Sequence, residues 1–236
     1  MKLASIFPVA NIEKTFNQSF AMMLAHLKEY YPECENNNCY KIMDNSLIEL
    51  GGAVNIETVI EAARSCNADE IILPDVFKDG EATMALATDT LEYLRTNGLL
   101  HEFKLMAVCQ GKDKEEFEKC FSFLNNLPEI HCIGIPKVMN TIIPGGRPAL
   151  EYLWERGKTS KCIHLLGCWT SLKEIFEYKN PQLIRSIDTC IPALLSKTTA
   201  DPFMDRPLKT IDLINDKIRE DNYEQMVNHF KNLNLI

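Results

Sequence analysis

The sequence predicts a parallel α/β protein of the (β/α)8 TIM-like barrel class. Short apolar segments alternate with helical segments along the chain, the connections are short, and the repeat is about 30 residues long. An open sheet is the competing arrangement, and the repeat length favours the closed barrel. The chain has 236 residues, 46% hydrophobic and 25% charged, which is enough for one large core. We therefore expect a single barrel domain over residues 1–236 that ends in a C-terminal helix.

Seven apolar segments are the predicted strands. They are residues 2–7, 40–44, 70–73, 104–109, 131–134, 161–166 and 183–187. Their nearly continuous apolar character is typical of parallel strands that are buried on both faces. The eighth strand is the least defined element, because residues 208–214 could supply it or the eighth unit could be irregular or incomplete.

Apolar spacing and capping residues define the predicted helices. A first helix over residues 11–30 is indicated by apolar residues at helical spacing and ends before Pro32. Asn55 and Asp113 are the predicted N-caps of helices that run to Cys66 and Asn126. The other predicted helices cover residues 81–96, about 146–156, 172–178 and a terminal segment that reaches Phe230.

Composition limits the class of protein further. The N-terminal apolar run is too short for a signal peptide, and no segment approaches the roughly 20 apolar residues of a membrane span. Nine cysteines are scattered singly, which favours reduced thiols in a cytosol. Cys34 and Cys39 flank a polar loop, which we prefer to a zinc site. We expect a soluble, cytoplasmic protein with no metal and no cofactor.

Polar residues and glycines collect where the predicted strands end. They are Asp44, Asn45 and Ser46 after the second strand, Asp75 after the third, Gln110 after the fourth, Gly145 and Gly146 after the fifth, Gly167 after the sixth and Asp188 after the seventh. In a β/α barrel these positions share one mouth, where such enzymes perform their chemistry. A strand that ends in an Asx turn explains Asp44 alone, but the recurrence at other strand ends favours a functional site.

Residue types narrow the chemistry of this site. The sequence has no metal-ligand spacing, no phosphate-binding glycine loop after a strand and no nucleophile-elbow motif. Carboxylates alone suit chemistry at an acetal-like carbon, where one attacks or stabilises an oxocarbenium-like centre and another moves protons. Asp75 beside Gln110 also suits guanine, whose N1–H and amine would donate to Asp75 and whose carbonyl would accept from Gln110 or the Gly146 N–H.

A basic rim is the second feature that bears on the ligand. Its members fall in predicted loops on one face and are Lys78, Lys112, Lys137, Arg147, Lys197 and Arg206. The net charge of −8 is unfavourable for a protein that grips nucleic acid through its whole surface, but it is compatible with a local basic rim. Ordinary solvated side chains are the simpler interpretation of any one of these residues.

Six motifs follow one another along the chain: DNS…GG, LPD, VCQGKDKEEF, IPGGR, IHLLG and IDTCIPALLSKT. Their order resembles the tRNA-guanine transglycosylase (queuine tRNA-ribosyltransferase) superfamily over residues 40–196, two thirds of the chain. The resemblance implies a barrel that exchanges guanine in a polynucleotide for a free 7-deazaguanine such as 7-cyano-7-deazaguanine. The target nucleotide would leave its stack to reach the barrel mouth.

The resemblance also implies roles for the strand-end residues. Asp188 matches the nucleophile that attacks C1′ of the sugar, and Asp44 matches the general acid/base. The residues assigned to substrate binding are Asp75, Gln110, Gly145, Gly146, Gly167, Asn45 and Ser46, and the nucleic-acid rim is assigned to Lys112, Lys137, Arg147, Lys197 and Arg206.

Two departures from the superfamily pattern affect the expected substrate. Asn45-Ser46 replaces the Gly-Gly that follows the first Asp, with Gly51-Gly52 further on. Residues 196–236 contain no cysteine, so the zinc subdomain that supports tRNA binding and dimerisation is missing from this sequence. Small phage-type DNA-guanine transglycosylases share that feature, so we expect DNA as the partner, with tRNA as the alternative. A phage-encoded enzyme that acts in the host cytoplasm fits the same expectation.

Two alternative hypotheses for the function are also compatible with the sequence. One is a non-catalytic barrel subunit of a base-modifying complex, which the presence of both Asp44 and Asp188 disfavours. The other is a nucleoside-processing enzyme that cleaves a different glycosidic bond. The sequence leaves open whether the chain works alone, as a homodimer or with a partner subunit.

Overall fold

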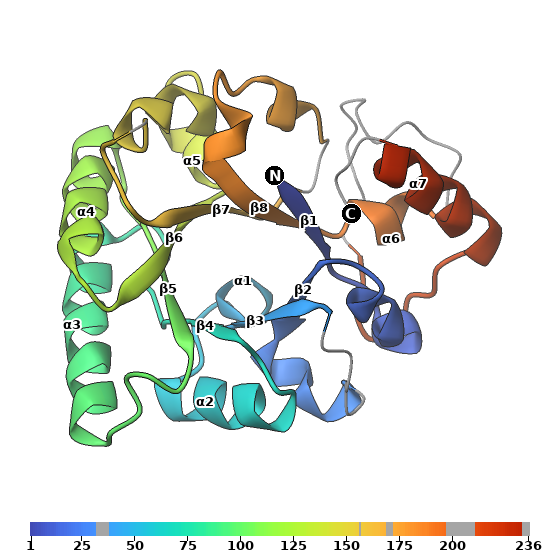
Figure 1. Ribbon diagram of the computed structural model, residues 1–236, viewed down its shortest axis with the longest axis horizontal. Coiled ribbons are helices and arrows are strands. Elements are labelled where there is room, and N and C mark those ends of the chain that lie inside the picture. Colours follow the sequence, from blue (N-terminus) through green and yellow to red (C-terminus); the bar gives the residue numbers. More distant parts are fainter. Residues whose placement is uncertain (32–37, 156, 169–171, 197–210, 233–236) are drawn as a thin grey trace.

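The computed structural model contains a closed barrel of eight parallel strands (Figure 1). It describes residues 1–31, 38–155, 157–168, 172–196 and 211–232. The strands are β1 (Lys2–Ser5), β2 (Phe20–Leu24), β3 (Tyr40–Asp44), β4 (Glu70–Ile72), β5 (Lys104–Val108), β6 (Ile130–Pro136), β7 (Cys162–Leu166) and β8 (Ile184–Thr189). Each strand pairs with its neighbours in chain order, and β8 pairs with β1. The predicted (β/α)8 TIM-like barrel is confirmed.

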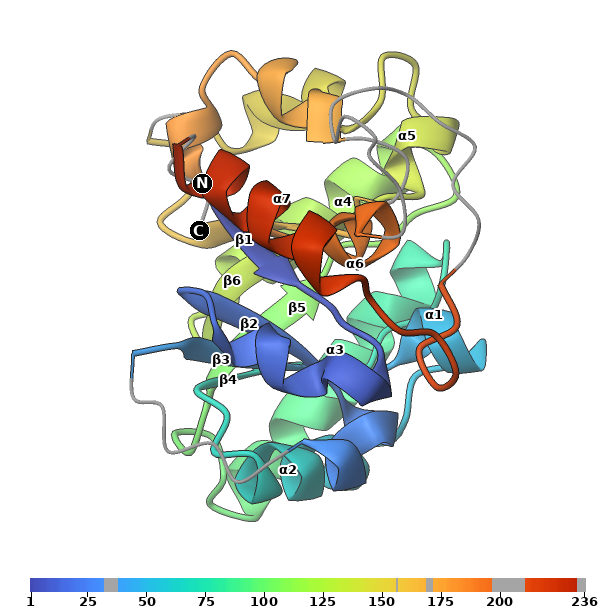
Figure 2. The same ribbon diagram turned by 90° about the vertical axis from the view of Figure 1, so that its right-hand side faces the viewer.

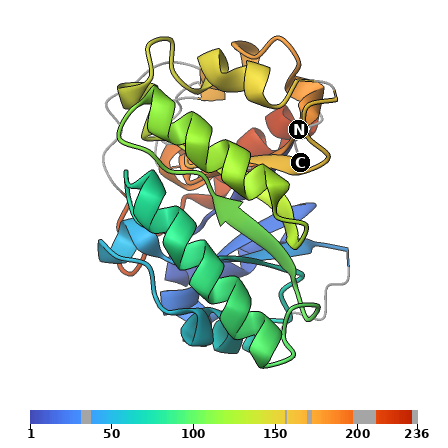
Figure 3. The ribbon, with the colours of Figure 1, turned by 90° about the vertical axis from the view of Figure 1, so that its left-hand side faces the viewer.

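Helices surround this ring of strands. The α-helices are α1 (Leu47–Leu50), α2 (Ile56–Ser65), α3 (Gly80–Thr96), α4 (Lys114–Asn126), α5 (Met139–Ile142), α6 (Ile191–Leu195) and α7 (Glu220–Asn232). The 3-10 helices are η1 (Val9–Phe16), η2 (Ala25–Tyr30), η3 (Arg147–Leu153), η4 (Leu172–Phe176) and η5 (Pro181–Leu183). Figure 2 shows α7 beside α6 on the outside of the barrel, and Figure 3 shows α3 and α4 side by side.

The strand that the sequence did not predict is β2, and it lies inside the segment predicted as the first helix. Residues 11–30 contain most of η1, all of β2 and all of η2. The helix prediction was wrong because the apolar spacing also fits a buried strand, and pairing with both β1 and β3 decides the outcome. The alternative strand over residues 208–214 is wrong for its described part, since residues 211–214 form no strand, and residues 208–210 lie outside the described residues.

The predicted caps of two helices are confirmed. Asn55 accepts a hydrogen bond from the Thr58 N–H at 2.9 Å, and Asp113 accepts one from the Glu116 N–H at 2.9 Å. The segments predicted as helices near residues 146–156 and 172–178 are instead the short 3-10 helices η3 and η4.

The barrel interior is apolar in its middle and polar at its amino-terminal end. Side chains from β1 to β6 fill the middle: Ala4, Met22, Ile42, Ile72, Met106, Val108 and Cys132. At the amino ends of the strands, the buried Glu70 carboxylate accepts hydrogen bonds from the Tyr40 hydroxyl at 2.6 Å and from Arg185 Nη1 at 2.7 Å. This packing fills the barrel below its carboxyl-terminal end, where the cavity described next is found.

Candidate active site

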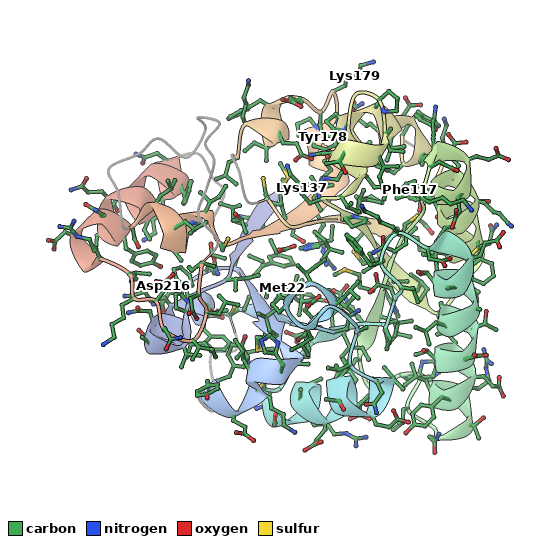
Figure 4. All side chains as sticks on the ribbon, turned by 180° about the vertical axis from the view of Figure 1, so that it is seen from behind. Met22, Phe117, Lys137, Tyr178, Lys179 and Asp216 are labelled. Atoms are coloured by element: carbon green, nitrogen blue, oxygen red, sulfur yellow. The ribbon has the colours of Figure 1, made fainter. Side chains whose placement is uncertain are left out.

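A cavity of about 640 Å³ lies at the carboxyl-terminal end of the barrel. Apolar side chains such as Met22, which Figure 4 shows inside the ring of strands, form much of its wall. The polar residues that line it include Asp44, Asn45, Glu49, Asp75, Gln110, Lys137, Gly167 and Asp188. The structure therefore brings the predicted residues Asp44, Asp75, Asp188 and Gln110 into one cavity. The volume of this cavity suits a small organic ligand.

Asp188 is held in place by two donors. Its Oδ1 atom accepts a hydrogen bond from the Gly167 N–H at 2.8 Å and lies 3.2 Å from His164 Nε2. Burial lowers the pKa of His164 despite the nearby carboxylate, so the ring is neutral at pH 7. A neutral ring that donates from Nε2 can accept at Nδ1 from the Ser186 hydroxyl, 2.8 Å away. These contacts fix the orientation of the carboxylate, and both fall on the same oxygen.

Asp44 lies in a different environment. Its Oδ2 atom accepts a hydrogen bond from the Ser46 N–H at 2.8 Å, and the residue is partly exposed to the cavity. Burial raises the pKa of Asp44, the negative charges of Glu49 and Asp188 raise it further, and the Ser46 hydrogen bond opposes the change. A carboxyl group with a raised pKa beside an oriented carboxylate is the arrangement that acid/base catalysis requires.

Asp75 is clamped between two carboxamides. Asn45 Nδ2 donates to its Oδ1 atom at 2.7 Å, and Gln110 Nε2 donates to its Oδ2 atom at 2.7 Å. Burial raises the pKa of Asp75 to about 6, although the hydrogen bonds from Gln110 and Asn45 lower it. The clamp fixes the plane of the carboxylate and leaves further lone pairs on each oxygen for a ligand with two adjacent donors.

A buried ion pair supports the other side of the cavity. Arg147 is fully buried and donates from Nε to Glu174 Oε1 at 2.7 Å. The same guanidinium donates to the backbone carbonyls of Leu166 at 2.7 Å and Gly167 at 3.2 Å. Lys137 Nζ also donates to Glu174, at 2.6 Å, and the Tyr178 hydroxyl donates to it at 3.0 Å; Figure 4 labels both residues. Glu174 thus ties the loops after β6 and β7 together.

Several predicted site residues lie away from the cavity. Gly145 and Gly146 do not line it, and the Gly146 N–H already donates to the Ile143 carbonyl at 2.8 Å. The predicted contact from that N–H to a guanine carbonyl is therefore not available in this structure. Ser46 is fully buried, and its hydroxyl accepts from the His26 N–H at 3.3 Å, so its contribution to the site is the backbone bond to Asp44.

The predicted basic rim is only partly present. Arg147 belongs to the buried ion pair and cannot be a rim residue. Lys137 lines the cavity but is paired with Glu174, whereas Lys112 is exposed and paired with Glu116 at 3.1 Å. Lys197 and Arg206 lie outside the described residues.

Three residues of the site were not assigned a role from the sequence. His164 lies within β7, and its two partners are Ser186 and Asp188 of the neighbouring strand. Glu49 lines the cavity from α1, and Glu174 neutralises Arg147 across 27 positions of the chain. The position of Glu49 five residues after Asp44 was a usable signal, whereas no local pattern marks Glu174.

No protein-family model matches the chain, and no curated protein is significantly similar to it. Among the residues that the structure describes, no helix is long and apolar enough to cross a membrane, and no group of three or more potential ligands could hold a metal ion.

Replacement of Arg147 by Met should destabilise the protein by about 3–5 kcal/mol at pH 7, because Glu174 would lose its main partner in a buried position. Arg95→Met on α3 is the matched control, since Arg95 is half exposed and its pairs with Glu92 and Glu129 are solvated. The control should change stability by less than about 1 kcal/mol. Urea unfolding of the three proteins measures the difference.

The difference in stability between wild type and Arg147→Met should depend on pH. Burial alone would raise the pKa of Glu174, but the charge and hydrogen bonds of Arg147, followed by those of Lys137, lower it to about 2 from 4.5. The ion pair therefore stabilises the fold above pH 4.5 and loses that contribution as the pH falls towards 2. The gap in stability between wild type and Arg147→Met should narrow below pH 4.5, and a gap that is constant from pH 7 to 3 would contradict this account.

Proposed function

We propose that the protein is a transglycosylase that exchanges guanine in a polynucleotide for a free 7-deazaguanine base. The observation that supports the proposal most strongly is the grouping of Asp44, Asp75 and Asp188 in one cavity at the barrel mouth, each with different partners. The order of the sequence motifs resembles that of the tRNA-guanine transglycosylase superfamily, and this resemblance supports guanine as the base that is exchanged.

Guanine would be recognised by Asp75. Its two oxygens are fixed in one plane by Asn45 and Gln110, so they can accept from the N1–H and the exocyclic amine of the base. The N–H of Gly146 is occupied and Gln110 Nε2 donates to Asp75, so the guanine carbonyl would need another donor. Lys137 lines the cavity and carries a cationic donor that could serve. The apolar wall of the cavity suits the faces of a planar heterocycle.

Asp188 would be the nucleophile. Its Oδ2 atom, which accepts no hydrogen bond from the described residues, attacks C1′ of the sugar, the bond between C1′ and N9 breaks, and the electron pair of that bond leaves with guanine. The other oxygen becomes the carbonyl of the new ester and keeps the hydrogen bond from the Gly167 N–H. That N–H stabilises negative charge on the carboxylate before attack and after its later departure.

Asp44 would move the proton. In its protonated form, which its raised pKa favours, it gives a proton to the departing guanine. The resulting carboxylate then takes the N9 proton of the incoming 7-deazaguanine, whose N9 attacks C1′ and releases Asp188. Each cycle returns both carboxyl groups to their initial states, and no cofactor enters the reaction.

The polymer in this proposal is DNA, with tRNA as the alternative, and the compartment is the cytoplasm. The target nucleoside would turn out of its stack, at a cost of a few kcal/mol in a duplex, to place C1′ beside Asp188. A nucleoside-processing enzyme remains the second candidate, because the pairing of Lys137 and Arg147 with Glu174 removes two of the cations expected at a polynucleotide surface. A homodimer or a partner subunit could supply additional positive surface.

Asp188→Asn should lower base exchange by roughly 10³-fold or more, because the amide is a poor nucleophile. Asp89→Asn, which changes an exposed carboxylate of α3, is the matched control and should retain activity. The measurement is incorporation of labelled guanine into guanine-containing DNA, tRNA and free guanosine. Full activity of Asp188→Asn would contradict the mechanism, and exchange into guanosine but not into polymer would establish the nucleoside-processing alternative.

Guanine binding should weaken as the pH falls through about 6. Asp75 is a paired acceptor only when ionised, and its pKa is raised to about 6 because it is buried. Each pH unit well below this value should therefore lower affinity by about tenfold. Calorimetric titration of free guanine between pH 5 and 8 measures the effect, with Asp75→Asn expected to bind weakly at every pH. A flat pH profile for the wild-type protein would remove Asp75 as the base acceptor.

A further inference from the structure

An exposed aromatic ring stands at the mouth of the cavity. Phe77 lines the cavity together with Ile48 of α1, yet 44% of its surface is exposed to solvent. The neighbouring residue is a lysine, and Lys78 Nζ lies 5.3 Å from the centroid of the Phe77 ring. An exposed ring next to a cation, at the entrance of a cavity, is costly to display in water and is typical of a binding surface.

The turn that carries this ring is fixed by its neighbours. The Asp79 N–H donates to the Val76 carbonyl at 3.1 Å, and the Val76 N–H donates to the Thr83 hydroxyl at 3.0 Å. Lys78 adopts a φ of +60°, which is uncommon for a residue other than glycine, and its N–H donates to Gln110 Oε1 at 3.1 Å. The backbone that carries the ring and the lysine is therefore held in a defined conformation.

The charge of Lys78 is available to a ligand. Within the described residues no carboxylate pairs with Lys78, whereas Lys137 is paired with Glu174 and Lys112 with Glu116. The turn is also linked to the base-recognition clamp, because Gln110 contacts the Lys78 N–H and Asp75 through the two atoms of one carboxamide. A ligand that occupies the clamp would have its neighbouring groups beside this turn.

We propose that Phe77 and Lys78 form a stacking platform for the nucleotide next to the target guanine in a single-stranded nucleic acid. The flanking nucleobase stacks on the exposed face of Phe77, and Lys78 binds the phosphate that joins it to the target nucleoside. Proteins hold single strands by stacking the bases on aromatic side chains and by placing cationic side chains against the phosphates of the nucleic acid. The inference rests on the proposed base exchange, since it places the target guanine against Asp75.

The test uses single-stranded oligonucleotides with one guanine and 2-aminopurine directly beside it, in DNA and RNA versions. Binding to wild type should quench the 2-aminopurine fluorescence, because the base stacks on the ring. Phe77→Ala should abolish the quenching at saturation and raise the Kd by roughly 5- to 100-fold, whereas Phe77→Tyr keeps a ring and should retain both. Tyr30→Ala, which removes an exposed ring of η2, is the matched control and should behave as wild type.

Lys78→Gln tests the phosphate contact separately. Loss of one phosphate contact should lower the slope of log Kd against log salt concentration by about 0.7 for a single strand. Equal quenching and equal Kd in wild type and Phe77→Ala would overturn the platform, even where wild type exchanges guanine normally. Quenching that depends on Phe77 in a wild-type protein that exchanges no base would support the platform and contradict the proposed chemistry. The comparison of DNA with RNA identifies which strand the platform holds.

Discussion

The pairing of β8 with β1 closes the barrel, and the candidate site depends on that closure. Asp188 lies opposite Ala4 in this pairing, at the end of the last strand. Asp44 is the last residue of β3 and Asp75 follows β4, and both are far from β8 in sequence. In an open sheet these carboxylates would be separated along one edge, whereas in a closed ring they face the same cavity. The parallel direction of all eight strands then places them at the same end of the barrel.

The three aspartates of the cavity differ in their hydrogen-bond partners. Asp188 has an N–H and a neutral histidine, Asp75 has two carboxamides, and Asp44 has one backbone N–H with carboxylates nearby. Burial raises the pKa of both Asp44 and Asp75, and the nearby negative charges raise that of Asp44 further, whereas hydrogen bonds from Gln110 and Asn45 lower that of Asp75. The buried pair of Arg147 and Glu174 anchors the Gly167 peptide that contacts Asp188.

Local sequence signals predicted the barrel, most strand ends and two helix caps, because each depends on residues close together in the chain. Asn55 and Asp113 satisfy the first turns of their own helices, and Asp44 ends its own strand. The strand β2 was not predicted, since its apolar spacing also fits a helix and only pairing with two distant strands decides between them. Contacts between distant segments, such as Arg147 with Glu174, have no local signature. The same limit explains why Arg147 was assigned to an exposed rim.

Detection of a covalent intermediate would test the central claim most directly. The measurement is intact-mass analysis of the protein after incubation with a guanine-containing DNA oligonucleotide in the absence of free base and quenching in denaturant. The account predicts an adduct whose mass equals the protein plus the oligonucleotide less one guanine, linked through Asp188 and absent from Asp188→Asn. Exchange of labelled guanine without any such adduct, or an adduct that maps to another residue, would contradict the assignment of Asp188 as the nucleophile.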